Sequence, residues 1–283
     1  MDKLRTFAND IRRSPTFLRR LLVVAIVLGI VSLAVAFIAT SPRRRAIELL
    51  RQHGANITLM SDRPLGNGGW FPRLNKLTVH LLSYMVGNER SQVLRGSIFG
   101  LSSIGFTEGT LDRNVFLAIS RLPELEAFSV QGCEFDPADL EPLAGLPRLS
   151  GIWLDNMPLS DAALKPFRKL KHLRWLSVSN TKIDGSAFAD TEWGCDTTLE
   201  WLVLSNNHLR EDIFWRLRRF KKLNRLEMDK CEVHEQESTG DAVREVEDFP
   251  VFPSLKELHC YRADLGSSRI YFEVQNPSVL ISD

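Results

Sequence analysis

The feature that most constrains the fold is a pattern of apolar residues that recurs about every 24 residues. In residues 173–183, LRWLSVSNTKI, leucines stand at the first and fourth positions, valine at the sixth, threonine at the ninth and isoleucine at the eleventh. The distances between the first leucines of successive copies are 24, 24, 24, 26, 24 and 32 residues. A chance arrangement would not hold one spacing so often, so the chain is built from structural repeats. The copies begin at Leu101, Leu125, Leu149, Leu173, Leu199, Leu223 and Leu255.

Each copy is too short to bury its own leucines. The middle of the pattern fits a short β-strand, in which every second side chain points inward. The intervening residues, such as 160–170 and 214–220, carry apolar side chains at helical spacing and predict a helical or near-helical return segment. Stacking the copies buries their leucines, at roughly 1.5–3 kcal/mol per side chain. The sequence therefore predicts an α/β solenoid with a parallel β-sheet on its concave face and helices or turns on its convex face.

The copies resemble leucine-rich repeats. The stretch LSDAALKPFRKLKHLRWLSVSNTKIDGSAF, residues 159–188, is similar to the 24-residue form that is common in bacterial membrane-anchored or exported repeat proteins. The resemblance covers about residues 100–268, and it implies a recognition surface without implying catalysis or a particular partner. The chain departs from the family pattern at the ninth position, where asparagine is usual. The residues at that position are Gly109, Cys133, Met157, Thr181, Asn207, Cys231 and Ala263.

A second feature lies near the N-terminus. Residues 21–40, LLVVAIVLGIVSLAVAFIAT, contain no charge and are long enough to span a hydrocarbon core of about 30 Å. They predict an uncleaved transmembrane helix, and a cleaved signal peptide is the alternative because Ala34-Val35-Ala36 resembles a cleavage site. The preceding basic segment, 1–20, favours a cytoplasmic N-terminus, and arginines also follow the span. We therefore expect a single-pass protein of the cell membrane with an extracytoplasmic solenoid.

Both ends of a solenoid need a cap, because the outermost repeats would otherwise expose their apolar cores. Residues 41–100 are predicted to form a juxtamembrane helix, a strand from about Asn56 and the N-terminal cap. Within this range, residues 72–86 fit either a cap helix or a further repeat. We assign about seven repeats to 101–268 and a C-terminal cap, with a strand, to 269–283.

The side chains that flank the two central apolar positions of each strand should face the concave surface. Because neighbouring strands lie about 4.7–4.9 Å apart, Trp153, Trp175 and Trp201 should form one aromatic patch. Aromatic side chains rimmed by charges are typical of an interaction hot spot. The alternative is that the tryptophans pack on one another, or under an insertion or a terminal arm, and bind nothing. The candidate binding residues are Trp153, Trp175, Trp201, Asp155, Arg225, Glu227, Asp229, Glu257, His259 and Tyr261.

The net charge and the absence of known motifs argue against several classes of ligand and cofactor. A formal net charge of +1 gives no reason to expect nucleic acid binding. No cofactor or metal is expected, because the six histidines and four cysteines lack the spacing of a metal site, and no phosphate-binding loop or nucleophile elbow is present. Packing is the expected role of Cys133, Cys231 and Cys260. Cys195 lies in an insertion, where an exposed and reactive thiol is the alternative.

These features predict a non-enzymatic, membrane-anchored module that recognises a protein or glycan partner through its concave face. A structural envelope protein that self-associates is the alternative. An enzyme with a site in the caps or insertions is a third possible class of function. A cytoplasmic adaptor would be a recognition module with the opposite membrane topology. The sequence leaves the ligand, the pathway and the oligomeric state open.

Overall fold

The structure is a computed structural model, and it describes part of the 283-residue chain. The predicted transmembrane segment, 21–40, lies outside the described residues except for Ile26, and the ambiguous segment 72–86 lies wholly outside them. Among the described residues, no helix combines the length and the apolar character needed to cross a membrane. The assignments of both segments therefore stay predictions. The described residues are 26, 41–59, 101–189, 192–234 and 249–282.

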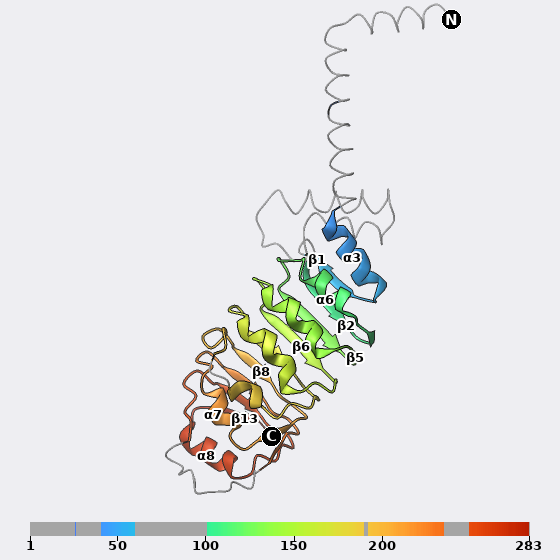
Figure 1. Cartoon of the computed structure of the whole chain (residues 1–283). Helices are drawn as coiled ribbons and strands as arrows, with labels where there is room; N and C mark the ends of the chain where they lie inside the picture. Colours follow the sequence, from blue (N-terminus) through green and yellow to red (C-terminus); the bar gives the residue numbers. More distant parts are fainter. Residues whose placement is uncertain (1–25, 27–40, 60–100, 190–191, 235–248, 283) are drawn as a thin grey trace, which may run out of the picture.

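The described chain forms an elongated solenoid with its strands stacked along one side (Figure 1). Its main sheet has nine strands in the order β1-β2-β4-β6-β7-β8-β10-β12-β13. β1 pairs antiparallel with β2, and all other neighbours in this sheet pair parallel. The strands are β1 (Asn56–Leu59), β2 (Leu101–Phe106), β4 (Ala127–Gln131), β6 (Gly151–Asp155), β7 (Trp175–Ser177), β8 (Trp201–Val203), β10 (Arg225–Glu227), β12 (Glu257–His259) and β13 (Leu280–Ser282).

The strands stack in the register that the repeat dictates. Leu176 of β7 pairs with Ile152 of β6 on one side and with Leu202 of β8 on the other, and Leu202 pairs with Leu226 of β10. The side chain at this position is at most 1% exposed in every strand from β2 to β12. Leucines and phenylalanines of successive repeats thus form one continuous core. The predicted parallel-sheet solenoid is confirmed.

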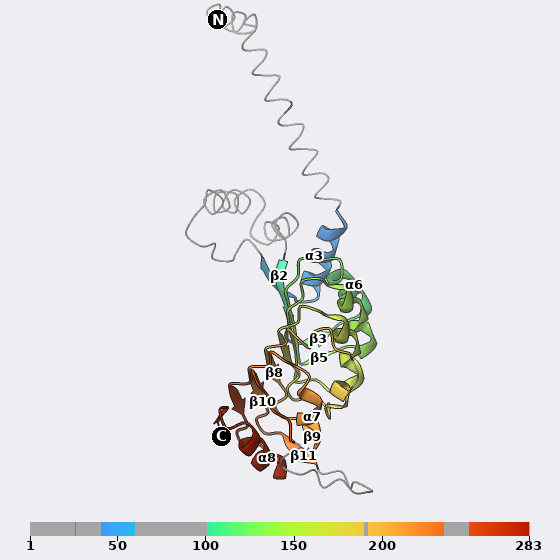
Figure 2. The same ribbon diagram turned by 90° about the vertical axis from the view of Figure 1, so that its left-hand side faces the viewer.

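The return segments are short and lie on the side of the solenoid opposite the sheet (Figure 2). Most are 3-10 rather than α-helical, since a 24-residue repeat leaves few residues between strands and Pro142 and Pro166 lie inside two of them. Two further parallel pairs join β3 (Gly109–Thr110) to β5 (Cys133–Glu134) and β9 (His208–Arg210) to β11 (Glu232–His234). The helical segments are α3 (Pro42–Gln52), α6 (Arg113–Ile119), η2 (Pro137–Gly145), η3 (Asp161–Lys169), η4 (Ser186–Ala189), α7 (Ile213–Leu217) and α8 (Ser267–Gln275).

From β4 to β12, the chain turns sharply after each strand of the main sheet through a residue with positive φ. Asparagine tolerates this left-handed conformation better than other side chains, which explains why three successive repeats carry Asn at this point. The Asn180 Nδ2 donates to the Asn156 Oδ1 at 2.9 Å, so the turns are also bonded to each other. The positive-φ residues at this repeat position are Gly132, Asn156, Asn180, Asn206, Lys230 and Arg262.

Polar side chains at the ninth repeat position bond the turns together inside the core. Asn207 is 1% exposed, and its Nδ2 lies 2.8 Å from the Val178 O and 2.7 Å from the Leu204 O. Its Oδ1 accepts from both the N and the Oγ1 of Thr181. The thiol of Cys231 donates to the Leu204 O of the preceding repeat at 3.1 Å. Thiol and hydroxyl donors therefore take over part of the role of asparagine in this chain.

Different elements close the two ends of the described solenoid. At the N-terminal end, α3 packs against α6, and β1 covers the edge of β2. At the C-terminal end, β13 pairs with β12 and α8 covers an aromatic cluster that includes Phe214, Phe249, Phe252 and Phe272. The buried Asn276 ties this end together, since its Oδ1 accepts from the Phe252 N at 2.7 Å. The β13 strand extends the sheet beyond the last repeat.

Candidate binding surface

Three rows of side chains cross the concave face, which is the outward side of the sheet (Figure 2). The register of the strands aligns the first two rows, and the third follows the strand ends. All ten residues that the sequence nominated lie in these rows. The first row is Ser103, Ala127, Gly151, Trp175, Trp201, Arg225, Glu257 and Leu280; the second is Gly105, Ser129, Trp153, Ser177, Val203, Glu227, His259 and Ser282; the third is Thr107, Gln131, Asp155, Ser179, Ser205, Asp229 and Tyr261.

The tryptophans form the centre of the concave face. Trp175 pairs in register with Trp201, and the rings of Trp153 and Trp175 lie 6.4 Å apart between centroids with their planes tilted by 37°. The Trp153 ring folds back over Gly151, where a Cβ would lie only 2.5 Å from the Trp153 Cη2. Glycine at 151 thus makes room for the ring. All three tryptophans are half-buried.

The insertion after repeat four does not cover this patch in the described chain. Trp193 packs against Phe188 and Phe220, with centroid distances of 5.3 and 5.9 Å, and both phenylalanines belong to the convex side. The Trp193 Nε1 donates to the Ala187 O at 3.2 Å. Cys195, in the same insertion, is fully buried, and burial raises the pKa of its thiol to about 12. The alternative of an exposed, reactive Cys195 is therefore wrong.

Arginines of the chain stack on two of the concave aromatic rings. The Arg225 guanidinium lies over the Trp201 ring, 4.7 Å from its centroid, and that of Arg174 lies 5.4 Å from the centroid of Trp175. A hydrogen bond from Arg174 to Glu200, at 2.7 Å, raises the pKa of this guanidinium. The Trp201 Nε1 is buried and has no hydrogen-bond partner among the described residues.

A network of charges follows the tryptophans along the concave face. Arg225 donates to the Glu227 Oε1 at 2.7 Å and reaches the Glu257 Oε2 at 3.2 Å. His259 lies between Glu257, at 3.4 Å, and the Ser282 hydroxyl, at 2.6 Å. These side chains hold one another in place, so they present an ordered polar surface.

The two aspartates of the third row bond to neighbouring strands. The Asp155 Oδ1 accepts from the Ser177 Oγ at 2.7 Å and from the Ser179 N at 2.9 Å. The Asp229 Oδ1 accepts from the Tyr261 N at 2.8 Å. Each aspartate therefore helps to fix the end of the next strand, a role that the spacing in the sequence did not indicate. Tyr261 itself is 46% exposed at the edge of the surface.

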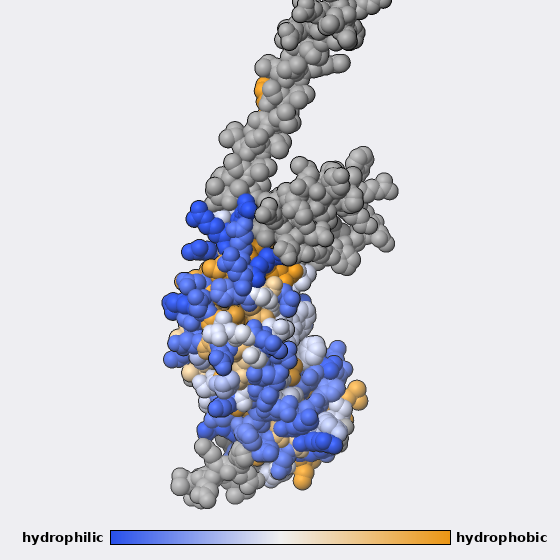
Figure 3. Space-filling view, turned by 90° about the vertical axis from the view of Figure 1, so that its right-hand side faces the viewer, coloured by the Kyte–Doolittle hydropathy of each residue, from blue (hydrophilic) through white to orange (hydrophobic). Residues whose placement is uncertain are grey.

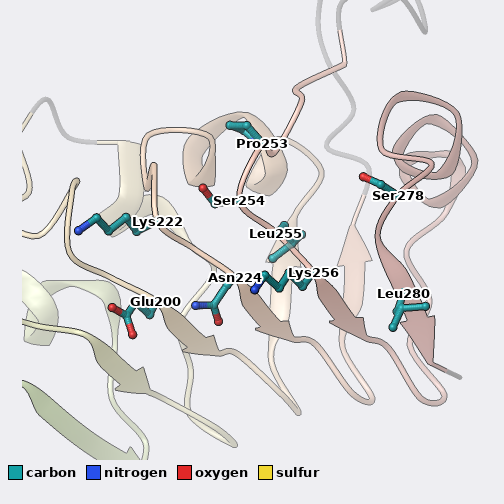
Figure 4. A pocket seen from close by; sticks show the side chains of 9 residues that line it. All are labelled: Glu200, Lys222, Asn224, Pro253, Ser254, Leu255, Lys256, Ser278 and Leu280. Carbon is teal, nitrogen blue, oxygen red and sulfur yellow. The ribbon is translucent and has the colours of Figure 1, made fainter.

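A pocket of about 670 Å³ opens where β8, β10, β12 and β13 begin (Figure 4). Glu200, Asn224 and Lys256 line it from the residues just before three of these strands. The sequence did not reveal it, because its lining comes from loops of separate repeats and follows no motif. The face of the described chain that Figure 3 shows is mainly hydrophilic, with hydrophobic residues in smaller groups. Among the described residues, no group of three or more His, Cys, Asp or Glu side chains could hold a metal ion.

No protein-family profile matches the sequence, and no curated protein matches it at a significant level. Among solved structures, an internalin (inlF) of Listeria monocytogenes is 16% identical, with a TM-score of 0.38, and the match covers 58% of this chain and 49% of the internalin chain. A leucine-rich-repeat protein of Leptospira interrogans is 18% identical, with a TM-score of 0.41 and coverage of 66% and 50%. A chain of the yeast Rad7–Elc1 complex is 15% identical, with a TM-score of 0.38 and coverage of 93% and 79%.

The match spans about half the length of the first two of these structures. The assignment of the fold comes from the chain itself. The 24-residue period, the parallel register of the strands, the inward leucines and the internal bonding of Asn207 occur together in it. The protein has the fold of a leucine-rich repeat protein.

Proposed function

We propose that this protein is a non-catalytic recognition module that binds a partner protein on its concave face. The observation that carries the proposal is the patch of Trp153, Trp175 and Trp201. Three half-buried tryptophans stand on adjoining strands of an ordered sheet, flanked by charges that are already held in place. Tryptophan and arginine dominate the binding energy of many protein interfaces, because they contribute large contact areas with few rotatable bonds.

We further propose that residues 21–40 anchor the module in a membrane, with the solenoid on the extracytoplasmic side. The sequence of that segment supports this part of the proposal through its length and lack of charge. Anchoring would restrict the search for a partner to the membrane surface and raise the effective concentration there. A glycan is a second ligand that the aromatic faces would accept by stacking, and binding assays must therefore include it.

Site-specific photo-cross-linking tests which face meets a partner. A photoreactive phenylalanine analogue would replace Gln131 or Val203, which lie on the concave face, or Lys165, which lies on the convex segment η3. The full chain would be irradiated in the cells that produce it. We expect adducts from the two concave positions and none of the same mass from position 165. Adducts from position 165 alone would refute the proposal.

Substitution of the tryptophans tests their part in binding. Changing Trp153, Trp175 and Trp201 together to serine should weaken capture of the cross-linked partner by at least about thirtyfold, because even one central anchor is worth about 2 kcal/mol or more. The matched control is Trp215→Ser, which removes a half-buried tryptophan from the convex side. Equal capture by both folded variants would show that the tryptophans only pack.

Self-association is the second candidate function, and the C-terminal end of the described chain favours it. Ile270 and Val274 on α8 are 64% and 58% exposed, and Leu280 on the last strand is 73% exposed. Apolar side chains in such numbers at one end of a repeat array suit a contact between copies. Sedimentation velocity of the full chain, wild type and Ile270→Glu with Val274→Glu, tests this candidate. A monomer at all concentrations would exclude it.

A further inference from the structure

The chain contains its own example of how the concave face holds a cation. The guanidinium of Arg225 lies 4.7 Å from the centroid of Trp201, on the neighbouring strand. The same guanidinium is bonded to Glu227, two residues further along its own strand, and to Glu257 on the next strand. An aromatic ring and carboxylates together therefore form a receptor for an arginine side chain at this point.

Trp153 and Asp155 present the same two chemical groups without a cation. They are two residues apart on β6, so both face the concave side. Asp155 uses its Oδ1 for Ser177 and Ser179, and its Oδ2 accepts no hydrogen bond from the described residues. No arginine or lysine of the described chain lies over the ring of Trp153, in contrast to Trp175 and Trp201.

The described neighbours of Trp153 are a second ring on one side and short side chains on the other. Trp175 flanks the ring on one side, at 6.4 Å between centroids. On the other side, the neighbouring strand β4 places only Ala127 and Ser129 at the matching positions. The ring therefore stands at the boundary between the aromatic patch and a stretch of short side chains.

The charge of the concave face also favours a cationic partner. Its three rows hold four carboxylates, at Asp155, Glu227, Asp229 and Glu257, against the single guanidinium of Arg225. Among the described residues of these rows the formal charge is thus −3 with His259 neutral, whereas the whole chain carries +1. A surface of this sign attracts a basic segment and disfavours an acidic one.

We propose that Trp153 and Asp155 bind neighbouring arginine side chains in a basic segment of the partner protein, one stacked on the ring, which lies over Gly151, and one paired with the carboxylate. This inference rests on the proposed function, since it names the chemistry of the partner that the concave face recognises. Arginine suits the site better than lysine, because a planar guanidinium both stacks on aromatic rings and donates in a fixed geometry to carboxylates. The attraction is electrostatic in part, so it weakens as the salt concentration rises.

A peptide titration of the full chain, solubilised in non-ionic detergent, tests the inference. The probes are hexa-arginine, hexa-lysine and hexa-glutamate, with binding followed by tryptophan fluorescence and calorimetry at low and high salt. We expect hexa-arginine to bind more tightly than hexa-lysine, and hexa-glutamate not to bind. Asp155→Asn keeps an oxygen for Ser177 and Ser179 but removes the charge, and should weaken hexa-arginine binding about two- to fivefold.

Two further variants complete the test. Trp153→Leu keeps an apolar side chain but removes the ring face, and should weaken binding by about the same two- to fivefold factor. Asp136→Asn is the matched control, because Asp136 also accepts a backbone N–H, from Ala138 at 2.9 Å, but lies outside the three rows. Absence of hexa-arginine binding, or equal weakening by Asp136→Asn and Asp155→Asn, would overturn the inference. The cross-linking experiment is independent of these peptides, so the proposed function can stand if the arginine site fails.

Discussion

Replacing Asn207 by alanine should test whether the internal ladder of polar side chains stabilises the solenoid. The side chain of Asn207 is buried and sits between two turns of the chain. Its amide nitrogen reaches the Val178 O and the Leu204 O, and its oxygen accepts from the backbone and the hydroxyl of Thr181. Alanine removes both donors and the acceptor at once.

The structure sets the size of the loss. Four short hydrogen bonds at roughly 0.5–1.5 kcal/mol each suggest a loss of about 2–6 kcal/mol. Two carbonyls keep another donor, since the Thr181 Oγ1 still reaches the Val178 O and the Cys231 thiol still reaches the Leu204 O. The Thr181 N keeps no partner among the described residues. We therefore expect the free energy of unfolding to fall by about 3 kcal/mol.

Urea denaturation followed by circular dichroism measures this loss, provided that the slope of the transition is unchanged. Asn207→Asp keeps the shape but turns a carboxylate oxygen toward the carbonyls, so at neutral pH it should lose at least as much stability as alanine. The control is Asn114→Ala, which changes an exposed asparagine on α6 and should shift stability by less than about 0.5 kcal/mol. A loss below about 1 kcal/mol for both Asn207 variants would refute the view that the ladder stabilises the turns.

Two other predictions concern the core and the tryptophan patch. Burial raises the pKa of Cys195 from 9.0 to about 12 and that of Cys231 to about 11, so neither thiol should react with Ellman's reagent near pH 8 until the chain unfolds. Because the pKa values of both thiols are higher in the folded chain, the stability that comes from keeping them neutral is fully present below pH 9.0. The free energy of unfolding should then decline as the pH rises toward 11 and 12. A free energy of unfolding that stays constant across this pH range would contradict the burial of both thiols. Gly151→Ala should displace the Trp153 ring, shift the fluorescence emission to longer wavelength and cost about 1–3 kcal/mol, whereas Gly145→Ala, with no atom within 4 Å of the added Cβ, should change neither measurement.

The repeat pattern was sufficient to predict the sheet and the rows of its concave face. Each strand begins about 24 residues after the previous one, and its inward side chains are apolar, so only one register buries all of them. That register also decides which side chains share the outer face. Trp153, Trp175 and Trp201 could therefore be assigned to one surface from their positions relative to the leucines.

The partners of the polar side chains depend on the tertiary structure. Asp155 and Asp229 bond to strands 22 to 32 residues away, and Arg225 turns onto Trp201 rather than into solvent. The repeat spacing brings these groups near each other, but the choice of rotamer depends on the size and charge of every neighbour. The ring of Trp153, for example, takes its place because residue 151 has no Cβ.

The sequence by itself thus determined the repeat architecture, the direction of the strands and the composition of the concave face, because these follow from a spacing along the chain. Only the tertiary structure decided which aromatic face already carries an arginine and which carries none. It also placed Trp193 and Cys195 in the convex core, whereas the sequence had left the exposure of Cys195 open. Contacts of this kind join residues that follow no common period, so they can be known only when the packed side chains are seen together.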